Sequence, residues 1–276
     1  MSEHFTATNA EYHAAPGISN SMVSTYLDPD GGPEMYEGLY LSKRFAREES
    51  DAFDAGTVVH DELLSGGGLV LEIPRDALDA AGKRTGKAWR QFQLDNPNRV
   101  LIRPQDMGPI RAMVDSVRAH PRARALLDLP GESEFSIRWT DEETGLDRRA
   151  RLDRVNDLAI VDLKTSISVN PRKFAASCLQ YGYFRQAGFY IDGFEAYSSE
   201  VRPFVFVAVK KTAPFTCMVY ELEPAFVELG RRQIREALRE IAERTKSGDW
   251  SGNREIVRLD APKWAYQADS FQLVSD

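Results

Sequence analysis

Cysteine is scarce in this sequence, which has only Cys178 and Cys217 among 276 residues. Two thiols cannot complete a four-cysteine metal or iron–sulfur site, and a pair so placed gives no sign of a disulfide scaffold. Long apolar runs are missing too: no segment approaches the roughly 18 apolar residues of a membrane span, and the first 17 residues lack a signal-peptide core. We expect a cytoplasmic protein that is neither exported nor embedded in a membrane.

An excess of positive charge is also absent. Lysine and arginine number 35 against 42 aspartates and glutamates, which gives a net charge of −7. DNA would repel the protein as a whole, so any DNA-binding surface must be local. The remaining composition, 42% hydrophobic and 28% charged, fits one large soluble domain with a substantial core.

Recognisable nucleophile motifs are the last absence. The sequence contains no Gly-x-Ser-x-Gly, and no nucleophile motif surrounds any of its four histidines, His4, His13, His60 and His120. A metal-independent hydrolase therefore has no support in the sequence.

Apolar periodicity and turn residues indicate helices in most of the first half of the chain. We expect a short helix from about Ser21, capped by the polar residues at 19–21, and a helix from about Asp51 that carries His60. A short strand over 69–73 and two helical stretches between 77 and 127 follow.

The second half begins with the shorter period of β-strands. The expected strands cover residues 134–139, 148–155, 158–163, 203–209 and 216–222. A helix over about 171–192 interrupts them, and an amphipathic helix over 226–242 follows. The fold class is therefore α/β (α+β), with a mixed central sheet of four to five strands flanked by helices.

The pattern that carries chemistry lies on two neighbouring strands. Asp153 lies on the first strand of a predicted hairpin, and Asp162 and Lys164 share one face of the second. Two carboxylates that converge repel each other unless a hard divalent cation lies between them, and magnesium is the natural candidate. Such an ion would polarise a phosphodiester and activate a bound water, while Lys164 would position that water or stabilise charge on the phosphate.

A structural ion pair is the plainer interpretation of the same residues. An Asp and a Lys two residues apart on a strand often form only a solvated edge. The neighbours Val161 and Leu163 indicate a buried strand, where an unpaired charge is costly unless a partner or a function offsets it. Both interpretations therefore stay open at this point.

These residues resemble a known family. Asp153, a gap of eight residues and Asp162-Leu163-Lys164 are similar to the signature of the PD-(D/E)XK nucleases, although Leu152 stands where the family name has proline. Further segments resemble the RecE-like (exonuclease VIII) branch, namely residues 12–21, 56–60, 186–190 and 262–265. The resemblance extends from about residue 12 to about residue 264, and it is weakest between about 73 and 130.

The resemblance implies a restriction-endonuclease-like core within a single exonuclease domain, residues 1–276. Residues 1–50 would form an N-terminal embellishment, 51–250 the catalytic core with a helical insertion at about 77–130, and 251–276 a C-terminal tail. The implied enzyme is a Mg²⁺-dependent deoxyribonuclease in which Mn²⁺ can substitute.

The resemblance also assigns roles to single residues. His60 is similar to the family's histidine metal ligand, beside Asp153 and Asp162. Gln186 and Tyr190 match a Gln-x-x-x-Tyr motif, whose i,i+4 spacing puts both on one helix face for phosphate or base contact. A tyrosine packed into the core with glutamine as its neighbour is the alternative. Glu134 would add a carboxylate to the site, or else lie exposed at a strand end.

Contact with DNA must come from local positive charge. Cations cluster in sequence around the proposed site, namely Arg148, Arg149, Arg151, Arg154, Arg172, Lys173 and Arg185. Strand alternation sends some of them to the far side, so no single one is assigned. Trp89 and Phe92, in the basic stretch 83–90, are expected to pack in the core, with stacking on DNA as the alternative.

The function that follows is metal-dependent exonuclease digestion of linear duplex DNA in phage-type or recombination DNA processing. By resemblance we expect 5′→3′ polarity, action at double-stranded DNA ends, a ring-like homo-oligomer and a single-strand annealing partner. Two alternatives keep the fold: a PD-(D/E)XK endonuclease, and a non-catalytic DNA-binding or assembly protein. The intact set of two aspartates and a lysine argues against the second.

Overall fold

One six-stranded sheet organises the computed structural model, which describes residues 2–46, 55–97 and 99–261. The strand order is β1-β4-β5-β6-β7-β8, and each neighbouring pair is antiparallel except β6 with β7. The strands are β1 (Ser2–His4), β4 (Gly131–Thr140), β5 (Asp147–Asn156), β6 (Ile160–Ser166), β7 (Phe204–Lys210) and β8 (Cys217–Glu221). The predicted mixed sheet is confirmed, and β1 adds an edge strand that the sequence pattern did not indicate.

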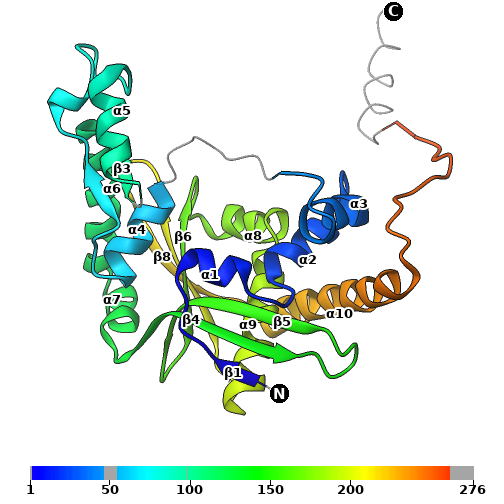
Figure 1. Ribbon diagram of the computed structural model, residues 1–276. Coiled ribbons are helices and arrows are strands. Elements are labelled where there is room, and N and C mark those ends of the chain that lie inside the picture. The colour runs from blue at the N-terminus through cyan, green and yellow to red at the C-terminus, as the bar shows by residue number, and fades with distance from the viewer. Residues whose placement is uncertain (1, 47–54, 98, 262–276) are drawn as a thin grey trace, which may run out of the picture.

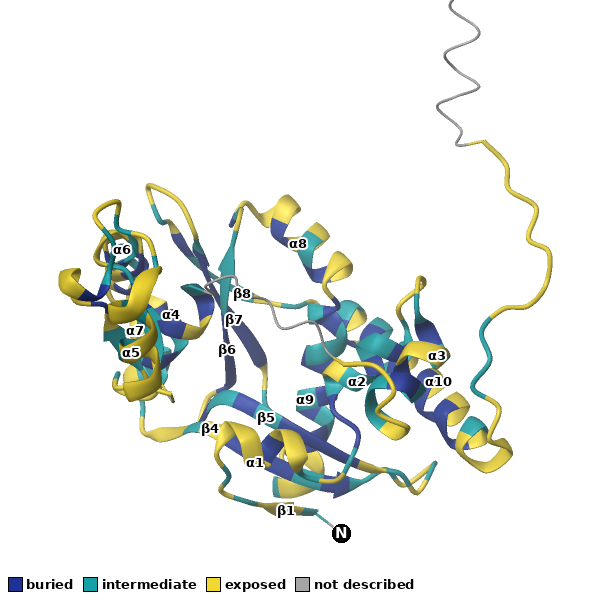
Figure 2. Cartoon of the chain, turned by 45° about the horizontal axis from the view of Figure 1, so that its top comes forward, coloured by how far each residue is buried: buried dark blue, intermediate teal, exposed yellow. Residues whose placement is uncertain are grey.

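Strands β5 and β6 pair only near the turn that joins them. Arg154 pairs with Val161 and Val155 with Ile160. Beyond these pairs, the Asp153 carboxylate accepts a hydrogen bond from the Leu163 N–H at 2.9 Å, where a backbone carbonyl would otherwise pair. Figure 2 shows β4 and β5 running across the molecule while β6 and β7 rise away from them. The sheet therefore opens into a fork between β5 and β6.

Helices cover both faces of the sheet, because side chains on β6 and β7 alternate between two apolar layers. One layer joins Ile160 and Phe206 to α9 (Tyr183–Ser198) and α10 (Pro224–Ser247). The other joins Val161 and Val207 to α4 (Ala55–Leu64) and α6 (Pro104–Ala119). The predicted helix that carries His60 is α4, and its expected beginning near Asp51 lies outside the described residues.

The N-terminal region packs beside the sheet as short helices. They are α1 (Asn9–Ala14), α2 (Asn20–Tyr26), α3 (Gly32–Tyr36) and the π-helix η1 (Glu37–Leu41). Ser19 caps α2 as expected, because its hydroxyl accepts a hydrogen bond from the Met22 N–H. The β4–β5 hairpin holds this region, because the Ile18 N–H donates to the Asp147 carbonyl at 2.7 Å.

The middle of the chain is more varied than its sequence indicates. It contains β2 (Val70–Glu72), the 3₁₀ turn η2 (Arg75–Ala77), α5 (Gly86–Asp95), β3 (Val100–Ile102), α6 and α7 (Pro121–Asp128). The predicted helical stretches appear as α5, α6 and α7, but β3 was not expected. It forms a parallel pair with β2, a partner 30 residues away that local periodicity does not report.

A single helix was expected over about 171–192, and the structure has two. They are α8 (Pro171–Gln180) and α9, and Gly182 separates them with a left-handed φ of 69°. Figure 1 shows α8 and α9 on the opposite side of the sheet from α4 and α6. Among the described residues, no helix is long and apolar enough to cross a membrane.

Candidate active site

A cleft of about 700 Å³ opens at the fork between β5 and β6. Helix α4, strands β4 to β6 and the start of α9 supply most of its walls. The lining residues are Asn9, Gly56, Thr57, His60, Asp61, Ser65, Leu69, Glu134, Arg151, Leu163, Lys164, Thr165, Tyr183 and Lys211.

Asp162 is fully buried beside this cleft and is held from two sides. Its Oδ2 contacts the Lys164 ammonium, and its Oδ1 accepts a hydrogen bond from Gln186 Nε2 at 2.7 Å. Burial raises the pKa of Asp162 to about 6 against the opposing charge of Lys164, and Asp153 adds to the rise. Desolvation tends to lower the pKa of Lys164, but the charges of Asp162 and Asp153 outweigh it and raise that pKa. The lysine therefore stays charged while its partner is an aspartate of unusually weak acidity.

His60 reaches both strands of the fork from α4. Val58 and Val59 pack with the buried face of β6, and this contact carries the next residue, His60, to the cleft. Its Nδ1 lies 3.5 Å from Asp153 Oδ2, and its Nε2 lies 2.8 Å from the Leu163 carbonyl oxygen. One imidazole thus meets two oxygen atoms from different strands.

Glu134 approaches the same point from β4. The register on either side of it puts Glu134 opposite Asp153 on the neighbouring strand. Its backbone has a left-handed φ of 55°, which is uncommon for a residue other than glycine, and its side chain lines the cleft. Glu134 is exposed, as the alternative interpretation of the sequence expected, and partial desolvation in the cleft raises its pKa while the Asp153 carboxylate adds to the rise. The cleft is therefore lined by two carboxylates, Glu134, 3.7 Å from Arg151 Nη1, and Asp61, whose Oδ2 accepts a hydrogen bond from the Leu69 N–H.

The donor atoms at the fork are of the types that a hard divalent cation prefers. The carboxylates of Asp153 and Asp162 and the carbonyl of Leu163 supply oxygen, and His60 supplies nitrogen. In the described part of the chain, no three His, Cys, Asp or Glu side chains are already grouped closely enough to hold an ion. The Lys164 ammonium supplies the positive charge next to Asp162 instead. A bound cation would take over that contact and the contact of His60 with Leu163.

Helix α9 supports the site from behind. Gln186 donates to Asp162, and the Tyr190 ring, one helical turn further along α9, packs against Phe204. Neither residue is among those that line the cleft, and both are half-buried.

Tyr183 was not singled out from the sequence, although its ring centre lies 5.0 Å from Lys164 Nζ and its side chain lines the cleft. Its i,i+3 spacing from Gln186 is a signal that would have identified it.

Most side chains of the predicted cationic cluster make contacts within the protein and are not free to bind DNA. Arg148 lies buried between the rings of Trp139 and Phe189, and desolvation lowers its pKa. Arg149 is also buried and donates to backbone carbonyls of the α1–α2 connection. The others that take part in internal hydrogen bonds are Arg151, Arg154 and Arg185. Only Arg172 and Lys173, at the start of α8, are exposed.

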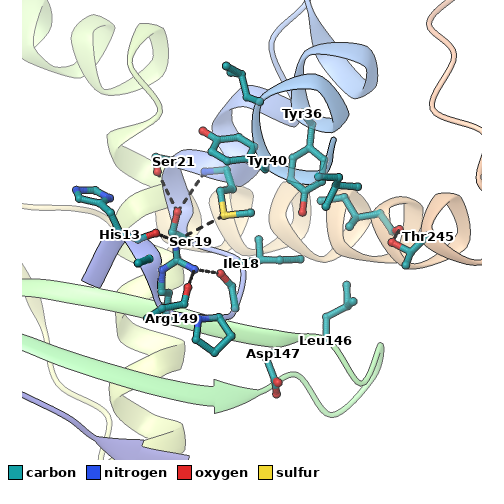
Figure 3. Close-up of a pocket in the computed structure, with 18 of the residues that line it drawn as sticks. His13, Ile18, Ser19, Ser21, Tyr36, Tyr40, Leu146, Asp147, Arg149 and Thr245 are labelled. Carbon is teal, nitrogen blue, oxygen red and sulfur yellow. Dashed lines mark hydrogen bonds between the residues drawn. The ribbon is translucent and has the colours of Figure 1, made fainter. Parts of the chain in front are cut away.

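The segment 12–21 contributes to two parts of the structure, the wall of the cleft and a separate hollow. Tyr12 lies beneath Arg151 of the cleft wall, with 4.4 Å from the guanidinium carbon to the ring centre. The following residues line a separate hollow of about 610 Å³, which Figure 3 shows between the α1–α2 connection, η1 and α10. His13, Ser19 and Ser21 lie on one side of this hollow. The segment 262–265, also matched from the sequence, lies outside the described residues.

Comparison with known proteins gives one family and a fold. Residues 33–259 match the family described as PDDEXK-like domain of unknown function (DUF3799). A candidate exonuclease from Eubacterium rectale is 15% identical, with a TM-score of 0.62 over 96% of this chain and 99% of that one. An alkaline exonuclease from Laribacter hongkongensis is 13% identical, with a TM-score of 0.27 over 68% of this chain and 97% of that one. No curated protein matches the sequence.

Proposed function

The chain belongs to the PDDEXK-like family DUF3799, and from this membership we propose that it is a metal-dependent nuclease that hydrolyses the phosphodiester bonds of DNA. The family match confirms the resemblance to the PD-(D/E)XK superfamily, whose nucleases generally use divalent metal ions. The RecE-like branch is the one that the sequence motifs indicate.

One observation carries the proposal: two aspartates, a lysine and a histidine from three elements meet where β5 and β6 separate. A purely structural ion pair of Asp162 and Lys164 accounts for two of these residues only. It gives no reason for His60 to contact Asp153, or for the left-handed Glu134 to lie opposite Asp153 on the cleft wall. A site for a cation and a phosphate accounts for all five.

We assign roles to the residues from this geometry. Asp153, Asp162 and His60 would hold the metal ion, which when bound supplies Lewis-acid activation of water and of the phosphate. Lys164 would then turn from Asp162 toward the cleft, where its ammonium stabilises the negative charge that develops on the phosphate. Gln186 keeps Asp162 oriented through its hydrogen bond, and Tyr190 lies on the same face of α9 one turn further along. Glu134 would orient the attacking water from the opposite side of Asp153.

The finer parts of the proposal rest on the RecE-like resemblance. We propose Mg²⁺ as the metal, with Mn²⁺ as a substitute, and 5′→3′ digestion from the ends of linear duplex DNA. The whole chain would act as one catalytic domain, in a ring-like homo-oligomer in the cytoplasm. A single-strand annealing protein would take over the strand that digestion exposes in recombination.

Product analysis on linear and circular duplexes tests the exonuclease proposal. We expect mononucleotides or short products from linear DNA with Mg²⁺, no products in excess chelator, and intact covalently closed circles. Linearised or nicked circles would instead identify a PD-(D/E)XK endonuclease. Binding to duplex ends without cleavage under any divalent metal would identify the non-catalytic alternative.

A further inference from the structure

Helix α5 and the turn before it carry positive charge that the proposed site does not use. Residues 80–94 contain four cations and neither Asp nor Glu, in a chain whose net charge is −7. The four are Lys83, Arg84, Lys87 and Arg90. A local reversal of the overall charge is what a DNA-binding surface needs in an acidic protein.

Helix α5 does not contribute to the core of the protein. None of the residues of α5 is buried. Trp89 and Phe92, which the sequence analysis expected to pack in the core, are half-buried and belong to neither apolar layer. The expectation of core packing was therefore wrong, and α5 stands on the surface.

One arginine fixes the inner face of α5 and leaves its outer face free. Arg84 Nη2 donates to the Leu101 carbonyl at 2.9 Å, and the Arg84 guanidinium carbon lies 5.8 Å from the centre of the Trp89 ring. Lys87 and Arg90, three residues apart, share the opposite face and are exposed. Within the described ranges, no ion pair involves either of them. Their charges are thus available to a partner.

The helix is joined to the rim of the cleft. Leu69 lines the cleft, and its carbonyl accepts a hydrogen bond from the Val100 N–H at 2.9 Å. Strand β3, which begins at Val100, in turn carries the carbonyl that Arg84 holds. Figure 1 shows α5 at the end of this extension, beyond α4. A duplex that leaves the cleft on the α4 side would pass this helix.

We propose that α5 is a duplex-binding arm whose outer face, Lys87 and Arg90, contacts phosphates of the DNA beyond the site of cleavage. This inference rests on the proposed function, because it takes the same DNA as its ligand. The arm compensates locally for the repulsion between the acidic protein and DNA. Its contacts carry no sequence information, as an enzyme that must pass over any sequence requires.

The test compares Lys87→Gln/Arg90→Gln with a matched double variant, Arg232→Gln/Arg235→Gln. The control removes the same charge at the same spacing from an exposed face of α10, away from α5 in Figure 1, although Arg235, unlike Lys87 and Arg90, is paired with Glu228 at 2.6 Å. Binding to a duplex of about 30 base pairs is measured in excess chelator, where no cleavage occurs, between about 50 and 200 mM salt. Gln is a good helix former, so α5 should persist in the variant.

We expect the α5 variant to bind about tenfold more weakly at the low end of this salt range, and the slope of log K against log salt to lose about two units. The α10 variant should bind as the wild type does. Equal affinity of the wild type and both double variants for the duplex would contradict the proposal that α5 binds DNA. Equal losses of affinity in both variants would contradict it too. The proposed function is tested separately: it fails if the wild type does not cleave DNA with any divalent metal.

Discussion

Lys164 contacts Asp162 inside the fork, and this contact suits either a catalytic group or a counter-charge. If the ammonium stabilises charge on the phosphate, Lys164→Ala should lower the single-turnover cleavage rate by about 10² or more. Metal affinity should stay unchanged or rise, because a positive charge near the cation is removed. Lys246→Ala, on the exposed end of α10, is the control. An early-melting Lys164→Ala protein with normal turnover per folded molecule would make the residue a structural partner.

Asp162 makes the stability of the metal-free protein depend on pH. Its folded pKa of about 6 lies above the ordinary 3.8, so its contribution to stability is fully present below 3.8 and is lost as pH rises through about 6. The loss should amount to on the order of 2 to 3 kcal/mol, the size of a shift of about two pKa units. In Asp162→Asn, residue 162 does not titrate. The melting temperature of the wild type should therefore fall relative to that of the variant as pH rises from about 3.8 to about 6.

Melting curves in chelator across this pH range measure that difference. Saturating divalent metal should shrink the fall, because the cation compensates the buried carboxylate. Asp157→Asn, in the exposed β5–β6 turn, controls for removal of a carboxylate elsewhere. A gap between wild type and Asp162→Asn that does not change with pH would show that the carboxyl does not titrate in this way.

Glu134 combines a left-handed backbone with a carboxylate in the cleft. Glu134→Gly and Glu134→Ala both delete the carboxylate, but only glycine relieves the backbone strain. Glu134→Gly should therefore be more stable than Glu134→Ala by about 1 kcal/mol. Both should lose about tenfold in cleavage rate if the carboxylate orients the water, the loss typical of a residue that supports a metal site. Wild-type cleavage in both would remove Glu134 from the site.

Helices α9 and α10 meet at Gly230, where a side chain has no room. A Cβ added there would lie 2.4 Å from the Phe184 carbonyl oxygen, a backbone atom that cannot turn away. Gly230→Ala should cost about 1 to 3 kcal/mol of folding free energy, and cleavage should fall because α9 also carries Gln186. Glu236→Ala on the exposed face of α10 should stay within about 0.5 kcal/mol of the wild type. Thermal melts check both, and equal stability would mean that the helices separate without cost.

Elements defined by local periodicity were predictable from the sequence. The strand pairs around Asp153 and Asp162 and the amphipathic α10 appear close to their expected positions. The elements that the sequence did not predict correctly are those that leave no periodic apolar pattern. The sequence gives no periodicity signal at Gly182, whose backbone conformation splits one expected helix into two, and three residues are too few for β1 or β3 to show alternation.

The fork itself was only half predictable. Hairpin register and alternation on β6 indicated that Asp153, Asp162 and Lys164 would meet. The contact of His60 with Leu163 joins residues 103 positions apart, so only family resemblance pointed to the histidine. The burial of Arg148 and Arg149 was not foreseeable, because a charged residue on a strand is normally exposed. Sequence reasoning thus identified the charged centre of the site but not which cations are left to face DNA.

The molecule as a whole is an acidic protein in which Asp153 and Asp162 lie at the fork between β5 and β6, and we propose that they hold a metal ion for DNA hydrolysis. The most direct measurement is single-turnover cleavage of an end-labelled linear duplex by the wild type and by folded Asp153→Asn, with Mg²⁺ and in excess chelator. We expect cleavage only by the wild type with Mg²⁺, and a loss of at least about 10² in rate for the variant. Full cleavage in chelator, or by Asp153→Asn, would contradict it.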